Sequence, residues 1–177
     1  MLSMKPIGNT PEELKKAKTL YYSAFPKNER RLFPELVENR FGGTEVFCFY
    51  DEKTFVGMAC LLNSADISHI IYLAVDESLR GHGYGSNALE LLHRSKSGRR
   101  IMVDIEVLDE HAENAEQRIM RKKFYLRAGY EETPVKYEWR QENYEILSFG
   151  GQISEEEYDG FWEDLHNLSI GKGNETD

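Results

Sequence analysis

The chain has 177 residues, 40% hydrophobic and 30% charged, a length and composition that suit one globular domain with a single core. Its 31 acidic and 22 basic residues give a formal net charge of −9, which argues against nucleic acid as the main partner. The sequence has no apolar run of membrane-spanning length and no signal-peptide core, so we expect a cytoplasmic protein that does not bind membranes.

The first elements expected along the chain are two helices. Thr10 is suited to cap a helix, Pro11 fits its first position, and Glu13 would complete a capping box. Apolar residues then recur at helical spacing until Pro26 ends the pattern. A second, short helix is expected at 32–37, before a pair of glycines.

Three strands are expected next. Residues 45–50 and 54–62 are rich in β-forming residues and predict a hairpin that turns at 51–53. Residues 67–75 predict a third strand. The two cysteines of the chain lie in the first two strands without a CxxC spacing, so we expect small buried side chains and no disulfide framework.

The second half of the chain alternates helices and strands. In chain order we expect a helix to about residue 97, a strand at 101–107, a helix at 114–128, a hairpin of strands at 135–139 and 144–149 that turns at 141–143, and a helix at about 154–167. Ser154 and Glu157 form a second capping box at the start of the last helix. The pattern predicts one mixed α/β sheet with helices on both faces, a single domain over residues 1–170 and a disordered tail at 171–177.

A glycine-rich loop separates the strand at 67–75 from the following helix. Gly81, Gly83 and Gly85 stand at alternate positions, and such a loop can direct backbone N–H groups at a phosphate. The P-loop pattern fails because no lysine follows. The dinucleotide pattern GxGxxG fits the first two glycines but has Ser86 in third place, and it begins only after several other elements. A Rossmann interpretation is weakened by this and stays an alternative.

A third pattern, [QR]-x-x-G-x-[GA], is matched at every specified position by Arg80-Gly81-His82-Gly83-Tyr84-Gly85. Here the sequence resembles the GNAT superfamily of N-acetyltransferases, and the surrounding segments YLAVDESLRGHGYG and FYLRAGYEE extend the resemblance. The resemblance covers residues 14 to about 149 and leaves out the last helix. It implies a mixed, mostly antiparallel twisted sheet of about six or seven strands, with acetyl-coenzyme A (acetyl-CoA) as co-substrate.

The resemblance also implies which residues hold acetyl-CoA. The loop N–H groups would bind its pyrophosphate, and the backbone of the preceding strand would bind its pantetheine arm and face the thioester carbonyl. The cofactor-binding residues expected in this way are Leu73, Ala74, Val75, Arg80, Gly81, His82, Gly83, Tyr84, Gly85, Ser86, Asn114 and Tyr125. From the residues alone, Asn114 is equally suited to cap its helix.

Two catalytic residues are expected. By the resemblance, Tyr125 would protonate the departing thiolate, although an aromatic residue at helical spacing also suits a core position. Glu106 is the leading candidate for the base and shares a strand face with Asp104. That face could instead be solvated. His69, Tyr72 or a chain of water molecules are the alternatives for the base.

The expected function is transfer of an acetyl group from acetyl-CoA to a primary amine, by direct attack in a ternary complex. The sequence has no nucleophile-elbow pattern, and its five histidines lack metal-ligand spacing, so we expect no acyl-enzyme and no metal. The alternative is a catalytically silent acyl-CoA-binding regulatory module. A small-molecule acceptor is favoured, a homodimer is compatible, and Glu29, Asp66 and Glu132 are candidates to receive a cation. A basic helix face is expected to be solvated: Arg118, Arg121, Lys122 and Lys123.

Overall fold

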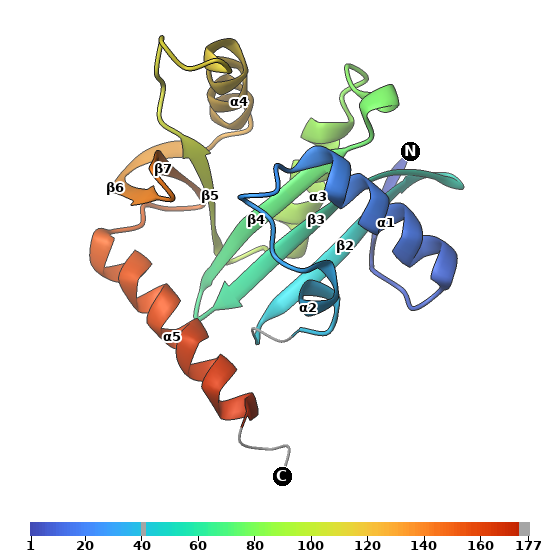
Figure 1. The fold of residues 1–177 in the computed structure, drawn as a ribbon, viewed down its shortest axis with the longest axis horizontal. Helices are drawn as coiled ribbons and strands as arrows, with labels where there is room; N and C mark the ends of the chain where they lie inside the picture. The colour runs from blue at the N-terminus through green and yellow to red at the C-terminus, as the bar shows by residue number, and fades with distance from the viewer. Residues whose placement is uncertain (40–41, 174–177) are drawn as a thin grey trace.

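The computed structural model describes residues 1–39 and 42–173. Within these residues the chain forms seven strands, five α-helices and one short 3-10 helix (Figure 1). In chain order they are β1 (Leu2–Pro6), α1 (Pro11–Ala24), α2 (Phe33–Val37), β2 (Thr44–Asp51), β3 (Thr54–Ser64), β4 (Ile67–Val75), η1 (Glu77–Leu79), α3 (Tyr84–Ser95), β5 (Arg100–Glu106), α4 (Ala115–Arg127), β6 (Glu131–Trp139), β7 (Glu142–Phe149) and α5 (Glu155–Gly173).

All seven strands belong to one sheet with the order β1-β2-β3-β4-β5-β7-β6. Neighbouring strands run antiparallel except β4 and β5, which are parallel. The predicted mixed, mostly antiparallel sheet is therefore confirmed. Strand β1 was not predicted, because it is a five-residue edge strand whose apolar alternation is limited to Leu2 and Met4 and which ends in Lys5 and Pro6.

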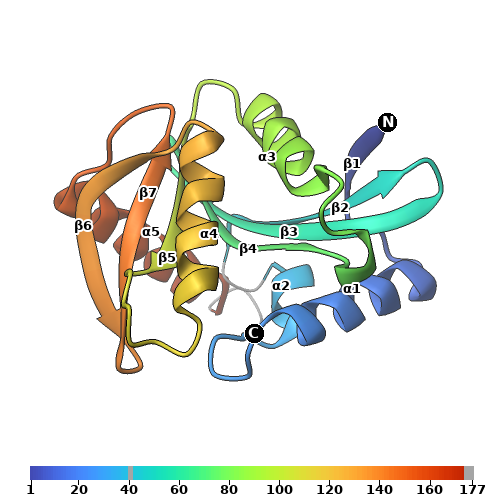
Figure 2. The same cartoon turned by 90° about the horizontal axis from the view of Figure 1, so that it is seen from above.

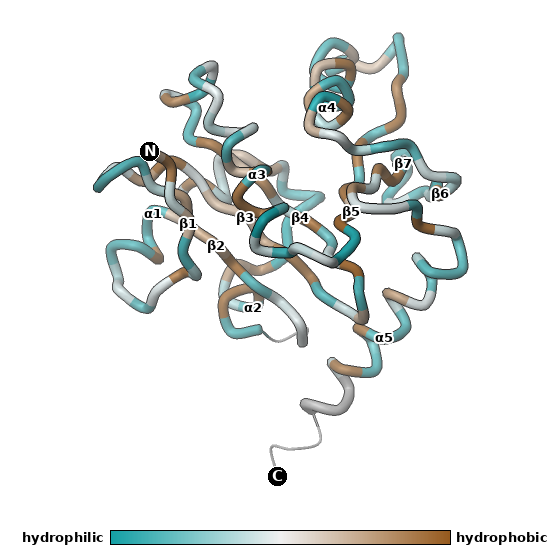
Figure 3. The backbone as a smooth tube through the Cα atoms, turned by 180° about the vertical axis from the view of Figure 1, so that it is seen from behind, coloured by the Kyte–Doolittle hydropathy of each residue, from teal (hydrophilic) through white to brown (hydrophobic). Residues whose placement is uncertain are grey.

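The helices cover both faces of the sheet, as the sequence predicts (Figure 2). Helices α3 and α4 lie on one face, where Leu89, Leu92 and Tyr125 pack against strand residues. Helices α1 and α2 pack on the other face over β2, β3 and β4. Helix α5 covers the same face farther along, over the strands from β3 to β7. Hydrophobic residues gather along the central strands, as Figure 3 shows.

The capping signals at the starts of α1 and α5 are confirmed with one exception. Ser154 Oγ accepts from the N–H of Glu157 at 3.1 Å, and Glu157 accepts from the N–H of Ser154 at 3.0 Å, which completes that capping box. Thr10 caps α1 by accepting from the N–H of Glu13. The Glu13 carboxylate instead accepts from the N–H of Gly8 at 2.9 Å and from Lys5 Nζ, so it ties β1 to α1.

Three expected boundaries in the last third of the chain are displaced. Strand β6 begins at Glu131, before the expected start at 135. The β6–β7 turn is formed by Arg140 and Gln141, both at positive φ, because Trp139 pairs directly with Glu142. Helix α5 continues to Gly173, and the remaining part of the expected tail, 174–177, lies outside the described residues. Along residues 1–39 and 42–173, no helix is long and apolar enough to cross a membrane.

Strands β4 and β5 pair over only four residues, from Ile67–Arg100 to Ile70–Val103. Strand β4 then continues to Val75 and β5 to Glu106 without further pairing between them. A β-bulge lies at this point, since Cys60 pairs with Tyr72 and Leu61 with Ile70, leaving Ile71 without a partner on β3. The bulge lies where the sheet divides. Beyond it, β4 and β5 diverge, as Figures 1 and 2 show.

Leu165→Ala in α5 is expected to lower the free energy of unfolding by about 2–3 kcal/mol, since Leu165 is 5% exposed in the core under this helix. Leu168→Ala, three residues later and 48% exposed, is the matched control and is expected to change it by no more than about 1 kcal/mol. Urea denaturation of both variants measures the difference. Equal losses would contradict the packing of α5 on the sheet.

Candidate active site

The glycine loop has the geometry of an anion cradle. Gly81 (φ 82°) and Gly83 (φ 79°) adopt the left-handed conformation that favours glycine, and no atom lies within 4 Å of a Cβ built on either residue. Gly83 is the N-cap of α3, so the first N–H groups of this helix have no partner within the helix. The N–H groups and the positive end of the helix dipole therefore suit a phosphate, as a bound coenzyme A would require.

The longer side chains of the loop are turned onto neighbouring parts of the chain. Arg80 Nε donates to the carbonyl oxygen of Val75 at 3.3 Å, and His82 Nδ1 lies 2.9 Å from the carbonyl oxygen of Arg80. The Tyr84 hydroxyl donates to Asp51 Oδ2 at 2.8 Å. These contacts fix the shape of the loop, while Ser86 lies exposed in the first turn of α3. The cradle is thus built mainly from backbone donors.

Beyond the bulge, alternate residues of β4 present their backbone groups to opposite sides. The N–H of Asp76 donates to the carbonyl oxygen of Val56 on β3. Because hydrogen-bonded and non-hydrogen-bonded pairs alternate along an antiparallel ladder, Ala74 also faces β3, whereas Leu73 and Val75 face the side from which β5 has diverged. Of residues 73–75, only Leu73 and Val75 therefore have backbone groups directed toward the side where a ligand could bind.

Tyr125 lies on the α3–α4 side of the sheet with 9% of its surface exposed. Its ring contacts Phe124 and Tyr130 edge-on, with centroids 5.1 and 5.2 Å away. Burial raises the pKa of Tyr125 to about 12, with Arg121 opposing the rise and Asp104 adding to it. Within the described part of the chain the hydroxyl makes no hydrogen bond, and it is not sealed from solvent. A protonated, unpaired phenol is therefore held beside the core.

Glu106 is buried, so the solvated alternative for its strand face is wrong. Both of its oxygen atoms are engaged, since Asn114 Nδ2 donates to Oε1 at 3.0 Å and Arg121 pairs with Oε2. Asn114 makes no side-chain capping bond, because its own Oδ1 accepts from Arg118 Nε at 2.7 Å. Asn114 thus links Glu106 to Arg118. From the sequence, Asn114 was expected to be a helix cap or a cofactor contact, and this link was not predicted.

Asp104 lies at the point where β4 and β5 stop pairing. Its carboxylate contacts His69 Nε2 at 2.9 Å and accepts from the Tyr137 hydroxyl at 2.8 Å. Burial alone would raise the pKa of Asp104, but these two hydrogen bonds outweigh it and hold the pKa below its usual value. His69 is itself buried against Phe161 and Trp162 of α5, which places this candidate base under the C-terminal helix.

Arg118 and Lys122 of α4 face the sheet, so the prediction of a solvated face is wrong for these two, whereas Arg121 and Lys123 are exposed as predicted. Arg118 is buried and donates to both carboxylate oxygens of Glu142, at 3.1 and 2.9 Å. Lys122 pairs with the buried carboxylate of Glu145 at 2.9 Å. These pairs, together with Arg121, anchor α4 to β5 and β7. Their partners lie 15 to 24 residues away in sequence, beyond the reach of helical spacing.

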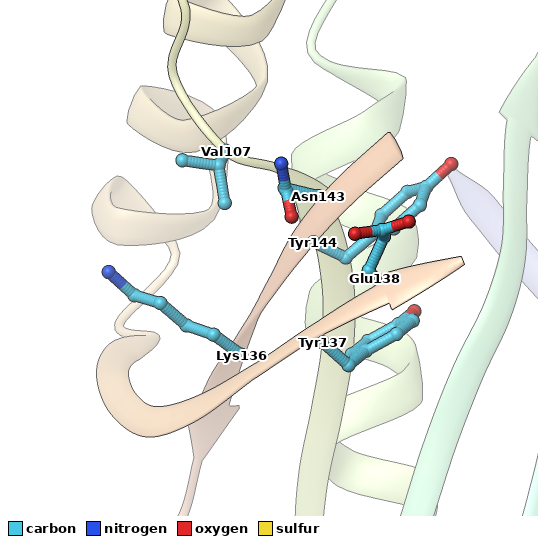
Figure 4. Close-up of a pocket in the computed structure, with 6 residues that line it drawn as sticks. All are labelled: Val107, Lys136, Tyr137, Glu138, Asn143 and Tyr144. Carbon is cyan, nitrogen blue, oxygen red and sulfur yellow. The ribbon is translucent and has the colours of Figure 1, made fainter. Parts of the chain in front are cut away.

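A pocket of about 400 Å³ opens beside the β6–β7 hairpin, near the free end of β5. Its lining residues are Val107, Lys136, Tyr137, Glu138, Asn143 and Tyr144. Figure 4 shows the rings of Tyr137 and Tyr144 on one side of the hairpin and Val107 and Lys136 on the other. The two rings stack with centroids 5.3 Å apart. Sequence patterns did not single out this aromatic pair, because the partners come from two strands.

Asp104→Asn is expected to lower the free energy of unfolding at pH 7 by about 1–3 kcal/mol, because it removes the charged acceptor of two hydrogen bonds. The folded-state pKa is depressed, so the contribution is full above the unfolded-state pKa of about 3.9 and is lost as the pH falls through the folded-state pKa. Denaturation should therefore show the same difference at pH 7 and pH 5 and a smaller one at pH 3, whereas exposed Asp159→Asn should show little at any pH. A difference that stays constant down to pH 3 would contradict this account.

No three His, Cys, Asp or Glu side chains of the described residues are placed to share a metal ion.

Comparison with known proteins points to the same family for the sequence and for the fold. The profile described as "Acetyltransferase (GNAT) domain" matches residues 42–132, which is just over half of the chain. None of the curated protein sequences compared with the chain gives a match.

Several solved structures share the fold. A protein assigned to the GNAT acetyltransferases, from Bacteroides thetaiotaomicron, superposes with a TM-score of 0.73 at 24% identity, covering 94% of this chain and 97% of its own. An aminoglycoside 6'-N-acetyltransferase complexed with coenzyme A gives 0.64 at 15% identity, covering 83% and 96%. A spermidine/spermine N-acetyltransferase from Vibrio cholerae gives 0.61 at 12% identity, covering 84% and 94%. The chain belongs to the GNAT acetyltransferase family, as the matched profile shows and its fold agrees.

Proposed function

We propose that this protein transfers an acetyl group from acetyl-CoA to a primary amine of a small molecule. The observation that carries the proposal is the division of the sheet between β4 and β5. The glycine cradle and Tyr125 lie toward the α3–α4 face of this division, and Asp104 and Glu106 lie on the opposite face of β5. A donor and an acceptor could therefore meet between the diverging strands.

Backbone groups supply the donor side. The N–H groups of the loop and of the first turn of α3 would bind the pyrophosphate, and those of Leu73 and Val75 would bind along the free side of β4. The bulge at Ile71 re-aims neighbouring backbone N–H groups, which suits polarisation of a carbonyl oxygen. The bound acetyl-CoA would supply an activated acetyl group as a thioester.

Tyr125 is proposed as the acid that returns a proton to the sulfur. Its phenol is protonated at neutral pH, since burial raises its pKa to about 12, and its hydroxyl has no competing partner in the described part of the chain. Glu106 is better placed to position Arg121 and Asn114 than to remove a proton from the amine itself, because both of its carboxylate oxygens are already bonded. Proton removal from the amine through water remains the simplest route that the geometry supports.

Direct attack by the amine agrees with the state of the cysteines. Cys48 and Cys60 are fully buried, and burial raises the pKa of Cys48 to about 12 and that of Cys60 further above its usual value. Neither thiol is placed to serve as a nucleophile at neutral pH. Cationic acceptors are favoured by the acidic character of the site, and the aminoglycoside and polyamine enzymes that share the fold are named for amine acceptors.

The test is thiol release from acetyl-CoA in the presence of a panel of primary amines, with mass spectrometry of the acetylated product. Turnover with at least one amine is expected, together with thermal stabilisation by coenzyme A but not by NAD. Stabilisation by coenzyme A without turnover on any amine would instead favour the catalytically silent module. Stabilisation by NAD alone would favour the Rossmann alternative.

A further inference from the structure

The connection between α1 and α2 is held to strand β4 and to helix α1 by tyrosine hydroxyls. Tyr72 on β4 donates to the carbonyl oxygen of Glu29 at 2.9 Å. The N–H of Arg31 donates to the hydroxyl of Tyr21 at 2.9 Å, and that hydroxyl lies 3.0 Å from the Arg31 carbonyl oxygen. The backbone around Glu29 is therefore held at a fixed place above β4, and its side chain is directed from there.

The Glu29 carboxylate faces the second half of the sheet. The Tyr144 hydroxyl donates to Glu29 Oε1 at 3.4 Å, a long hydrogen bond, and Tyr144 is the cross-strand partner of Glu106. The backbone of Glu29 is thus hydrogen-bonded to β4, and its carboxylate is hydrogen-bonded to β7. Burial raises the pKa of Glu29, nearby Glu106 and Asp104 raise it further, and Arg121 and the Tyr144 hydroxyl oppose the rise.

Three carboxylates thus share this region, and Glu29 differs from the other two. Arg121 pairs with Glu106, and His69 and Tyr137 hold Asp104. Glu29 makes no ion pair with any Lys or Arg in the part of the chain that the structure describes. A half-buried carboxylate without a cation is unfavourable, and a bound cation would relieve both the desolvation and the repulsion from its neighbours.

We infer that Glu29 binds a second positive charge of the acceptor, so that the substrate class is amines carrying at least two cationic nitrogen atoms. This inference rests on the proposed function. One nitrogen would be acetylated between β4 and β5, and the Glu29 carboxylate would hold the other. The ring of Tyr144, whose hydroxyl contacts Glu29, offers a face for a cation and for the methylene chain between the nitrogens, whereas Tyr137 already stacks on both Tyr144 and Tyr158.

Matched pairs of acceptors test the inference, because they differ by a single charge. The wild-type protein is expected to acetylate 1,4-diaminobutane with a kcat/KM at least about 10-fold above that for n-butylamine, as a charged hydrogen bond would provide. Glu29→Gln is expected to lower kcat/KM for the diamine by about 10- to 100-fold, mainly through KM, and to change that for the monoamine by less than about 3-fold. Glu163→Gln, an exposed carboxylate on α5, is the matched control and should change neither.

Two further measurements keep the test decisive. The KM for the diamine should rise as falling pH protonates Glu29, and Glu29→Gln should lack this rise. Calorimetric titration of 1,4-diaminobutane into the protein saturated with coenzyme A measures binding without turnover. If Glu29→Gln but not Glu163→Gln weakened the binding of 1,4-diaminobutane, and the wild type acetylated no amine, the cation site would be supported and the proposed function refuted. Equal losses for the diamine and the monoamine, or no preference for the diamine, would overturn the inference.

Discussion

Tyr125→Phe is expected to lower kcat by about 100- to 1,000-fold while leaving the affinity for coenzyme A unchanged. The substitution removes a proton donor and keeps the ring contacts with Phe124 and Tyr130, so the core around α4 should be preserved. General acid catalysis by a positioned side chain contributes about 100- to 10,000-fold, and a thiolate is a better leaving group than most, which places the expectation toward the lower end. Steady-state kinetics and calorimetric titration of coenzyme A measure the two quantities.

Tyr130→Phe is the matched control for this experiment. Tyr130 is buried like Tyr125, at 2% against 9% exposed, but its hydroxyl lies 3.2 Å from His93 Nε2, and burial raises its pKa. Its removal is expected to reduce stability by about 1 kcal/mol and to leave kcat within about 3-fold of the wild type. If Tyr125→Phe retained full activity, the assignment of the acid would be wrong and the proton would have to reach the sulfur from water.

Gly83→Ala is expected to weaken coenzyme A binding by about 10- to 100-fold. A Cβ at this position would project from the N-cap of α3 into the open space above the cradle, where a phosphate must approach the backbone closely. The left-handed backbone also becomes strained, by about 1–2 kcal/mol. Calorimetric titration with coenzyme A gives the affinity, and thermal unfolding gives the stability.

Gly98→Ala separates these two effects. Gly98 has the same left-handed φ, 82°, and open space around its Cβ, but it follows α3 instead of preceding it. The same loss of stability is expected with unchanged affinity for coenzyme A. Equal losses of affinity in the two variants would mean that backbone strain alone explains the result and that the loop is no cradle.

The glycine loop proposed to bind the donor could be predicted from the sequence because its residues are local. Positions 80–86 are adjacent in the chain, their glycines announce an unusual backbone, and the strand and helix around them have clear periodicities. The pattern could not tell that Ala74 faces β3, because the direction of its backbone groups depends on pairing with Met58. A strand's own sequence does not record which neighbour each residue bonds.

The acceptor side could be predicted only in part because it is assembled from distant segments. The shared face of Asp104 and Glu106 follows from strand alternation and is confirmed. Their partners do not follow, since Arg121 and Tyr137 come from another helix and another strand. Glu29 was one of three candidate carboxylates, and only its hydrogen bond to Tyr144, 115 residues away, distinguishes it from Asp66 and Glu132, which pair with Arg100 and Lys122.

The short pairing of β4 with β5 has a mechanical consequence. Among the described residues, four β4–β5 residue pairs and the hydrogen bond from the N–H of Arg100 to the carbonyl oxygen of Asp66 join the backbones of the two halves of the sheet, so side-chain packing must carry the remaining load. The core under α5 joins Leu62 and Ile67 from one half with Met102 and Ile146 from the other, and Phe161 lies between them. The C-terminal helix, outside the segment that the family profile matches, therefore joins the two halves of the sheet on one face, as the core under α3 and α4 does on the other.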